Sequence, residues 1–332
     1  MTTFLESEKP KQAAFKAIAP YFSDAARARG IYRNKPYPFC LPREYAEENL
    51  VPGIRQSVTD YFASREIKWH DGQDRRPSNH LCDSQVCCVN FLFPFADKPQ
   101  ALAALLRPVF PPIEEMLPIE DSQFVAHEWI GMDNYLHEKM PRHGKRTRGA
   151  NFTSADAAVM FKRKDGLKQI VLIEWKYTES YGGTFLRFAK SGTDRAQIYQ
   201  HLYDREGCPI NKQLLPSYYA FFFEPFYQFM RQQFLAHEME RAHELGADIV
   251  SVLHITPAHN SNFQKITSPE LRSLGNSATD VWTKLISTPD RFISISTEQL
   301  FGHFAIDQYP DLQSWYDYIT ARYSWLLSHS TN

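Results

Sequence analysis

The stretch SADAAVMFKRKDGLKQIVLIEWKYTESY, residues 154–181, predicts a β-hairpin. Two runs of residues that favour strands, AAVMFK and QIVLIEWKY, flank the turn-forming sequence Lys-Asp-Gly at residues 164–166. We adopt a three-residue loop, with a type I turn and Gly166 in the left-handed conformation. The alternative is a two-residue turn at Asp165 and Gly166, which would send the two acidic side chains of the hairpin to opposite faces of the sheet.

The three-residue loop decides which side chains oppose each other across the hairpin. With Arg163 and Leu167 as the flanking pair, counting back along both strands sets Asp156 opposite Glu174. Directly opposed residues share a face, with Cβ atoms about 4.5–5.5 Å apart. Lys176 lies two residues beyond Glu174 and therefore projects from that same face. The sequence thus predicts a cluster of two carboxylates and one amine.

Two opposed carboxylates destabilise a strand pair, because like charges repel and burial raises the pKa of at least one of them. A bound divalent cation removes both penalties. Mg²⁺ typically takes one or two protein carboxylates and completes its shell with water and substrate phosphate. A lysine beside it can orient a water or balance charge on a phosphoryl oxygen. The cluster predicts metal-assisted phosphodiester hydrolysis, and a surface ladder with a Glu–Lys contact is the alternative.

An aspartate, a hairpin and Glu-x-Lys at the end of an apolar strand resemble the PD-(D/E)XK nuclease superfamily. The longer string SADAAVMF…LIEWKYTESYGG is similar to a bacterial branch of restriction endonucleases. The resemblance runs from about His80 to Phe301, and its specific part is the hairpin. Ala155 stands where the superfamily often has a proline. The resemblance implies a restriction-endonuclease-like α/β core, with a mixed central β-sheet flanked by helices.

By this resemblance, Asp156 and Glu174 bind Mg²⁺, for which Mn²⁺ would substitute. The backbone carbonyl of Trp175 adds a metal ligand, and Lys176 positions or activates the attacking water. The implied protein is a metal-dependent deoxyribonuclease, a restriction-type endonuclease with DNA as its partner. Since duplex cleavage needs two such sites, we expect a twofold homodimer. A non-catalytic DNA-binding or scaffolding protein of the same fold, in a defence or repair system, is the alternative.

Further candidate residues lie outside the hairpin. Glu128, on a predicted strand, is a candidate for the upstream carboxylate of many relatives, with an exposed edge glutamate as the alternative. Gln197, on a predicted helix, is a candidate for supporting the active site. Four basic residues between positions 139 and 155 are candidate contacts for DNA phosphates, and a solvated basic loop is the alternative. They are Arg142, Lys145, Arg146 and Arg148.

Two parts are expected in the chain, an N-terminal helical elaboration over residues 1–75 and a nuclease-like core with a C-terminal extension over residues 76–332. Apolar periodicity and turn residues predict the elements along both parts. The predicted helices cover residues 1–30, 42–67 with a break at Pro52-Gly53, 81–93, 193–204 and 225–245. Besides the hairpin, the predicted strands cover residues 123–130, 217–223 and 248–255.

Composition indicates a globular protein, with 332 residues of which 43% are hydrophobic and 23% charged. The net charge of −1 means that any DNA contact must come from local basic patches. Five cysteines without regular spacing favour a reducing compartment. Cys82, Cys87 and Cys88 would diverge on one helix, so we do not expect a zinc site there. No signal peptide and no apolar run of roughly 20 residues is evident, and we expect a cytoplasmic protein without membrane contact.

Overall fold

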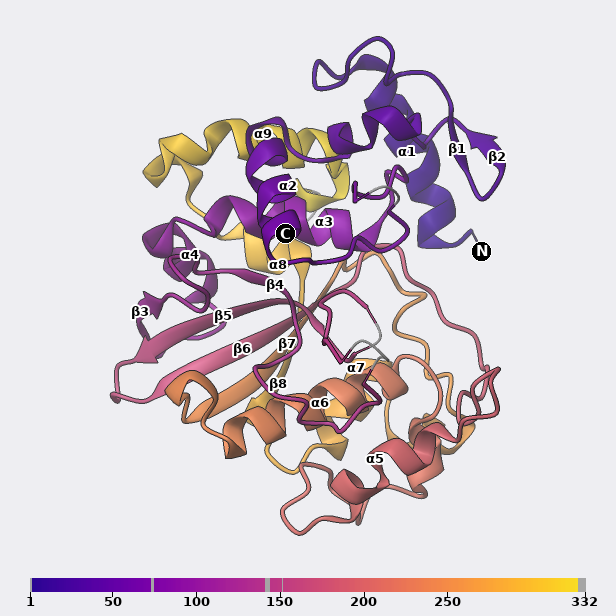
Figure 1. The fold of residues 1–332 in the computed structure, drawn as a ribbon, viewed down its shortest axis with the longest axis vertical. Helices are drawn as coiled ribbons and strands as arrows, with labels where there is room; N and C mark the ends of the chain where they lie inside the picture. The colour runs from indigo at the N-terminus through magenta and orange to yellow at the C-terminus, as the bar shows by residue number, and fades with distance from the viewer. Residues whose placement is uncertain (1, 73–74, 141–143, 151, 328–332) are drawn as a thin grey trace.

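A six-stranded mixed sheet lies at the centre of the computed structural model, which describes residues 2–72, 75–140, 144–150 and 152–327 (Figure 1). The strands of this sheet are β3 (Ile113–Leu117), β4 (Ala126–Trp129), β5 (Ala155–Arg163), β6 (Lys168–Trp175), β7 (Ile249–Thr256) and β8 (Phe292–Ser296). A separate hairpin consists of β1 (Gly30–Tyr32) and β2 (Lys35–Tyr37). The helices are α1 (Phe4–Ile18), α2 (Arg55–Ser64), α3 (Ser84–Leu92), α4 (Pro99–Leu106), α5 (Arg195–Asp204), α6 (Phe226–Arg241), α7 (Ala278–Leu285), α8 (Thr297–Gly302) and α9 (Gln313–Arg322).

The strand order is β3-β5-β6-β7-β8, and β4 pairs with β5 on the same side as β3. β5 runs antiparallel to β6, whereas β6, β7 and β8 are parallel to one another. The central strands β6 and β7 are almost continuously apolar, because both of their faces are covered. The predicted α/β class with a mixed sheet is therefore confirmed.

The hairpin of β5 and β6 has the predicted register. β5 and β6 pair with Met160 opposite Ile170, in line with the three-residue loop. The backbone nitrogen of Arg163 donates to the carbonyl of Leu167 at 2.8 Å, and Gly166 has a φ of +87°. Only glycine adopts that conformation at little cost, so the loop residue fixes the register of both strands.

Helices cover both faces of the sheet in two layers (Figure 1). One layer contains α1, α3, α4, α8 and α9, whose apolar side chains form one hydrophobic core with the sheet. The other layer contains α5, α6 and α7, which form a second core against the opposite face. Side chains from the first 75 residues, such as Phe15 and Phe62, belong to the same core as Trp175 of β6. The N-terminal elaboration is thus packed directly against the nuclease-like core.

Residues 217–223, predicted as an aromatic strand, form instead a short 3₁₀ helix over Tyr218–Phe221. The hydroxyl of Ser217 accepts a hydrogen bond from the backbone nitrogen of Tyr219 at 3.2 Å and so begins this turn. The aromatic side chains are buried in the core beside α6. A short, continuously apolar run does not distinguish a strand from a buried helical turn, which explains the wrong prediction.

The N-terminal helix is shorter than predicted. α1 begins at a capping box, in which Thr3 and Glu6 satisfy each other's backbone nitrogen atoms, and ends at Ile18 rather than near residue 30. Gly30 is the first residue of β1, where an added Cβ would lie 1.9 Å from the carbonyl oxygen of Leu41. The glycine therefore permits a close backbone approach rather than a helix end. The strands β3 and β8 were not predicted at all.

The five cysteines are buried and unpaired. This agrees with the interpretation of Cys82, Cys87 and Cys88 as core residues. In the part of the chain that the structure describes, no helix is long and apolar enough to cross a membrane.

We predict that the stability of the protein falls in mild acid because of His127. This side chain is 1% exposed and lies among the rings of Tyr61, Phe62 and Phe93. Burial lowers its pKa from 6.5 to about 3. Between these two pH values the histidine is protonated in the unfolded chain and neutral in the folded chain. The contribution of His127 to the free energy of unfolding is therefore constant above pH 6.5. It is lost as the pH falls from 6.5 towards 3, at about 1.4 kcal/mol per pH unit.

The substitution His127→Phe tests this prediction, since it keeps an aromatic ring and removes the titrating group. Urea unfolding between pH 7 and pH 5 should show a shallower loss of stability for this variant than for the wild type. The exposed His303→Gln variant serves as the control and should follow the wild type. Parallel curves for wild type and His127→Phe would contradict the prediction.

Candidate active site

The strand register places five polar residues at one level of the sheet, one from each of β4 to β8. They are Glu128, Asp156, Glu174, His254 and Ser294. This level is the end of the sheet at which the strand β5 begins and β6 ends. Helices from both layers reach it, because α3 contributes Gln85 and α6 contributes Gln232. The site is therefore built where the two hydrophobic cores meet at one end of the sheet.

Asp156, Glu174 and Lys176 come together as the hairpin register predicts. The carboxylate of Asp156 accepts a hydrogen bond from the backbone nitrogen of Trp175 at 2.7 Å. Glu174 forms an ion pair with the ammonium of Lys176 and also accepts a hydrogen bond from the amide of Gln232. The Glu174 and Lys176 residues are 1% and 5% exposed, so their pair is buried. A surface Glu–Lys contact, the alternative interpretation, is excluded by this burial.

Negative charge is in excess at this site. Burial and the nearby Glu174 carboxylate raise the pKa of Asp156 well above its ordinary value. Burial likewise raises the pKa of Glu128. Burial acts to lower the pKa of Lys176, but the acidic groups around it, with Glu174 the strongest, together outweigh burial and hold that pKa well above the usual range. Three acidic side chains thus lie beside one ammonium, with the imidazole of His70 3.7 Å from Glu128, which is the electrostatic environment that favours a cation.

The oxygen atoms at this site fit a hard divalent cation. Asp156 and Glu174 offer carboxylates, and the carbonyl of Trp175 points to the same edge of β6 as its N–H group, which Asp156 binds. The hydroxyl of Ser84 lies 3.4 Å from that carbonyl oxygen, a long hydrogen bond. Among the described residues, no group of three His, Cys, Asp or Glu side chains is arranged to hold a metal. Two carboxylates and a carbonyl are nevertheless a donor set that suits Mg²⁺.

Glu128 is a buried side chain, 1% exposed, and not the exposed edge glutamate that was the alternative. Its carboxylate accepts hydrogen bonds from the amide of Gln85 at 2.5 Å and from the hydroxyl of Ser154 at 2.8 Å. Its backbone has a φ of +51°, which is uncommon for a residue with a side chain. Strain of this kind persists only where the surroundings hold it in place, and it clusters at functional sites.

Arg148 holds the backbone of β4 at this strained position. Its guanidinium donates to the carbonyl oxygen of His127 at 2.9 Å, to the carboxylate of Glu120 at 2.7 Å and to the hydroxyl of Tyr61 at 2.9 Å. The same hydroxyl accepts a hydrogen bond from the backbone nitrogen of His127 at 3.1 Å. Arg148 was predicted to contact DNA phosphates, but its donors are used inside the protein, where they position the strand that carries Glu128.

The other predicted phosphate contacts lie in different surroundings. Arg146 donates to the carbonyl oxygen of Gly131 at 3.1 Å and to that of Ile130, so it too is bound to the β4 end of the protein. Lys145 is exposed and forms an ion pair with Glu66 at 2.5 Å. Arg142 lies outside the described residues.

Gln197, predicted to support the active site, is exposed on α5. The glutamine that reaches the site is Gln232, on α6, which is 1% exposed and donates to Glu174. His254 was also missed. It lies opposite Glu174 in the parallel register, is fully buried, and has an Nε2 atom without a hydrogen-bond partner in the described structure. The available signal for His254 was a polar residue inside an apolar strand, whereas Gln232 is one of several polar residues on α6 and carried no such signal.

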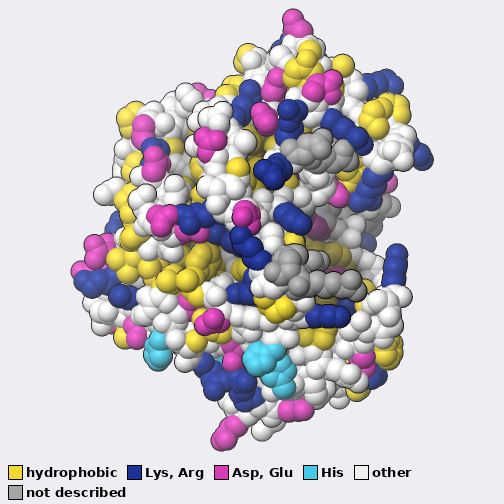
Figure 2. All heavy atoms as spheres, in the orientation of Figure 1, with side chains coloured by type: hydrophobic (Ala, Val, Ile, Leu, Met, Phe, Trp, Pro, Cys, Tyr) yellow, Lys and Arg dark blue, Asp and Glu magenta, His cyan; other side chains and the backbone are white. Residues whose placement is uncertain are grey.

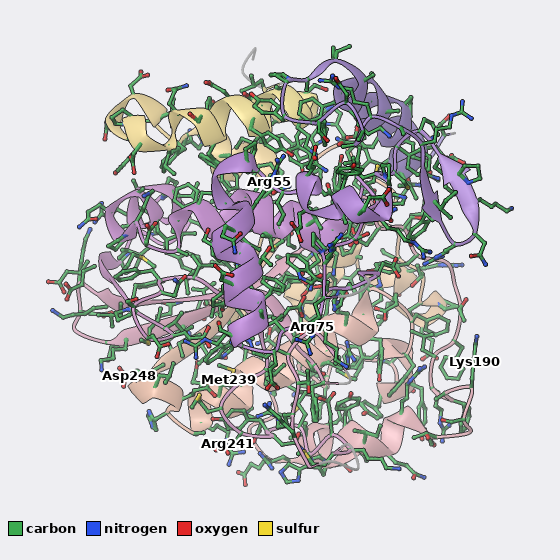
Figure 3. All side chains as sticks on the ribbon, turned by 45° about the horizontal axis from the view of Figure 1, so that its top comes forward. Arg55, Arg75, Lys190, Met239, Arg241 and Asp248 are labelled. Atoms are coloured by element: carbon green, nitrogen blue, oxygen red, sulfur yellow. The ribbon has the colours of Figure 1, made fainter. Side chains whose placement is uncertain are left out.

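Basic side chains gather near this end of the sheet although the chain is nearly neutral. Figure 2 shows Lys and Arg side chains across the middle of one face of the molecule. A hollow of 510 Å³ is lined in part by Arg65, Lys145, Arg146 and Arg148. A second hollow of 410 Å³ includes Lys68 and Arg75, the latter labelled in Figure 3. Glu66 lines both hollows and Glu120 lines the first, so part of this positive charge is neutralised within the protein.

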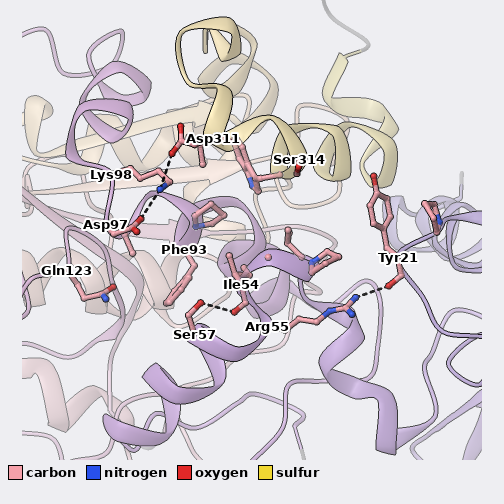
Figure 4. Close-up of a pocket in the computed structure, with 18 residues that line it drawn as sticks. Tyr21, Ile54, Arg55, Ser57, Phe93, Asp97, Lys98, Gln123, Asp311 and Ser314 are labelled. Carbon is pink, nitrogen blue, oxygen red and sulfur yellow. Dashed lines mark hydrogen bonds and ion pairs between the residues drawn. The ribbon is translucent and has the colours of Figure 1, made fainter.

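A larger cavity of 720 Å³ lies in the other part of the molecule, among the N-terminal residues, α2 and α9 (Figure 4). Its charged side chains Lys98 and Arg55 are already paired. Lys98 lies 3.4 Å from Asp97 and 3.0 Å from Asp311, and Arg55 donates to the carbonyl of Tyr21 at 2.8 Å. None of the five polar residues in the row across the sheet lines this cavity. Its size alone does not make it the candidate active site.

A mixed sheet covered by helices on both faces, with an acidic and lysine cluster at the end of its central hairpin, defines a restriction-endonuclease-like α/β protein. The chain belongs to the REase-ARP family, described as restriction endonuclease associating with ARP, whose family model matches residues 9–324. Comparison with curated proteins and with solved structures gave no match. Membership of this family gives the chain a nuclease-related role.

Proposed function

We propose that this protein is a Mg²⁺-dependent deoxyribonuclease of the PD-(D/E)XK type that hydrolyses DNA phosphodiester bonds as a restriction-type endonuclease. The observation that carries the proposal is the buried group of Asp156, Glu174 and Lys176 at the end of the hairpin. A surplus of buried carboxylate beside one ammonium is costly to fold. That cost is understandable if the group binds a cation and a phosphate.

Asp156, Glu174 and the carbonyl of Trp175 would hold the metal. When bound, the cation would supply positive charge that stabilises the phosphate in its transition state and makes a water more acidic. The hydrogen bond from the Trp175 nitrogen orients the Asp156 carboxylate, and the Gln232 amide does the same for Glu174. Groups fixed in this way need no reorganisation during the reaction, which is the main source of electrostatic catalysis.

Lys176 carries the fixed positive charge of the site. Its ammonium stays protonated, since the pKa is held above the usual range. It therefore serves as a donor that orients the attacking water and balances charge on a non-bridging phosphate oxygen, not as a general base. Glu128, tied to Gln85 and Ser154, provides a further carboxylate beside Asp156 that would orient a water or a second ligand of the cation.

DNA is the proposed substrate because the chain belongs to a restriction endonuclease family, and basic side chains such as Lys68 and Arg75 lie among those that line the nearby hollows. The family description names an association with ARP, and we extend this association to the present chain as part of the proposal. A twofold homodimer and a cytoplasmic location remain predictions from the sequence.

Supercoiled plasmid incubated with the purified protein tests the proposal. We expect conversion to nicked or linear DNA in Mg²⁺ and in Mn²⁺, and none with a chelator. A control protein that carries Asp156→Asn excludes a contaminating nuclease. Binding of DNA without metal-dependent cleavage would support the non-catalytic alternative instead and would overturn the enzymatic proposal.

A further inference from the structure

Arg231 lies on α6 immediately before Gln232, the residue that binds Glu174. Its guanidinium lies over the ring of Tyr227, 4.9 Å from the ring centroid. The guanidinium of Arg195 lies 5.8 Å from the same centroid. Two arginines therefore share one buried aromatic ring beside the candidate active site.

The two arginines differ in what they bind. Arg195 donates to the carbonyl of Leu186 at 2.7 Å. Within the described residues, Arg231 forms no hydrogen bond and no ion pair within 4.0 Å, and its Nε atom is buried without a partner. Arg231 is only partly buried, so a guanidinium that has no acceptor among the described residues is open to an acceptor supplied from outside the chain.

Acidic and phenolic side chains surround Arg231. Its guanidinium interacts electrostatically with the carboxylates of Glu138 and Glu224 and with the hydroxyls of Tyr199 and Tyr227. Glu138 accepts hydrogen bonds from the backbone nitrogen of Thr153 at 2.8 Å and from its hydroxyl at 2.6 Å, just ahead of the strand that carries Asp156.

Glu224 faces the site from the other direction. Its carboxylate interacts with the charges of Arg231, Lys176 and Glu174. Arg231 also stands next in sequence to Gln232, whose amide contacts Glu174, so the arginine is carried by the same turn of α6 that reaches the proposed catalytic group.

We propose that Arg231 binds a DNA backbone phosphate next to the one that is cleaved. The inference rests on the proposed nuclease function and adds a substrate contact to it. A planar guanidinium presents a fork of donors that matches phosphate oxygens. The ring of Tyr227 supports one face of the guanidinium and limits its motion, so less conformational entropy is lost when phosphate binds.

Binding of a fluorescently labelled duplex oligonucleotide, measured in a chelator so that no cleavage occurs, tests this contact. Arg231→Gln should weaken binding about tenfold, the usual loss for one charge-assisted hydrogen-bonded contact. The logarithm of the association constant falls with the logarithm of the salt concentration, and for this variant the line should be less steep by about 0.9, the value for one phosphate contact fewer. Arg241→Gln is the matched control, because Arg241 is exposed on the same helix and pairs with Glu238 at 3.2 Å (Figure 3). It should bind as the wild type does.

Arg231→Lys separates a phosphate contact from a purely structural role. Lysine keeps the positive charge but lacks the planar, bidentate donors of the guanidinium. We therefore expect weaker binding with the same salt dependence as the wild type. Unchanged affinity and slope in a folded Arg231→Gln or Arg231→Lys variant would overturn the inference, as would a wild-type protein that does not bind DNA. A wild type that binds DNA through Arg231 and never cleaves it would support the contact and reject the proposed nuclease function.

Discussion

Asp156→Asn is expected to abolish cleavage of plasmid DNA, with a loss of about 10³-fold or more. The carboxylate is one of two proposed metal ligands, and a neutral amide oxygen binds a divalent cation far more weakly. The amide oxygen can still accept the hydrogen bond from the backbone nitrogen of Trp175, which Asp156 now accepts at 2.7 Å. The loss should therefore affect catalysis and leave the fold intact.

The same variant should be at least as stable as the wild type at neutral pH in the absence of metal. The pKa of Asp156 is raised in the folded state, so its ionised carboxylate destabilises the fold above the unfolded-state pKa of about 3.9. Removing the charge removes this penalty. Thermal unfolding measures the effect directly, with and without Mg²⁺.

Addition of Mg²⁺ gives a second readout that does not depend on activity. A ligand that binds only the folded state raises the unfolding temperature. We expect such a rise for the wild type and little or none for Asp156→Asn. If Asp156→Asn cleaves DNA at the wild-type rate, or responds equally to Mg²⁺, the assignment of this residue as a metal ligand is wrong.

Lys176→Met is expected to eliminate cleavage and also to destabilise the protein by about 3–5 kcal/mol in the absence of metal. The ammonium of Lys176 is the ion-pair partner of Glu174, and both residues are buried. Methionine has a similar length, so packing changes little, but the carboxylate of Glu174 loses its counter-charge. An unpaired buried charge accounts for most of the expected cost.

The double variant Glu174→Gln with Lys176→Met isolates this cause. With both charges gone, the free energy of unfolding should recover most of the loss, while cleavage stays absent. Urea unfolding of the wild type, the two single variants and the double variant gives the coupling energy. A Lys176→Met protein as stable as the wild type would contradict a buried ion pair, and normal DNA cleavage by both Asp156→Ala and Lys176→Ala would reject the active site itself.

The surroundings of the hairpin show why some site residues escaped prediction. Gln232 and His254 follow Glu174 by many residues. Gln232 is one of several polar residues on α6, and His254 lies in a largely apolar strand, so no local pattern connects either of them with Glu174. The basic residues Arg146 and Arg148 suggested a DNA-facing loop, but their donors bind backbone carbonyls near β4. Residue type told where positive charge lies in the chain, and packing decided whether that charge faces solvent.

The hairpin itself could be derived from the sequence, because its register depends on turn chemistry and on the two-residue period of strands, both of which are local. Gly166 and the alternating side chains were enough to bring Asp156 and Glu174 to one level. Burial of Glu174 with Lys176, the strained place of Glu128 and the approach of α3 and α6 were decided only by the tertiary structure. They depend on elements far apart in the chain that meet because each must bury an apolar face against the same sheet.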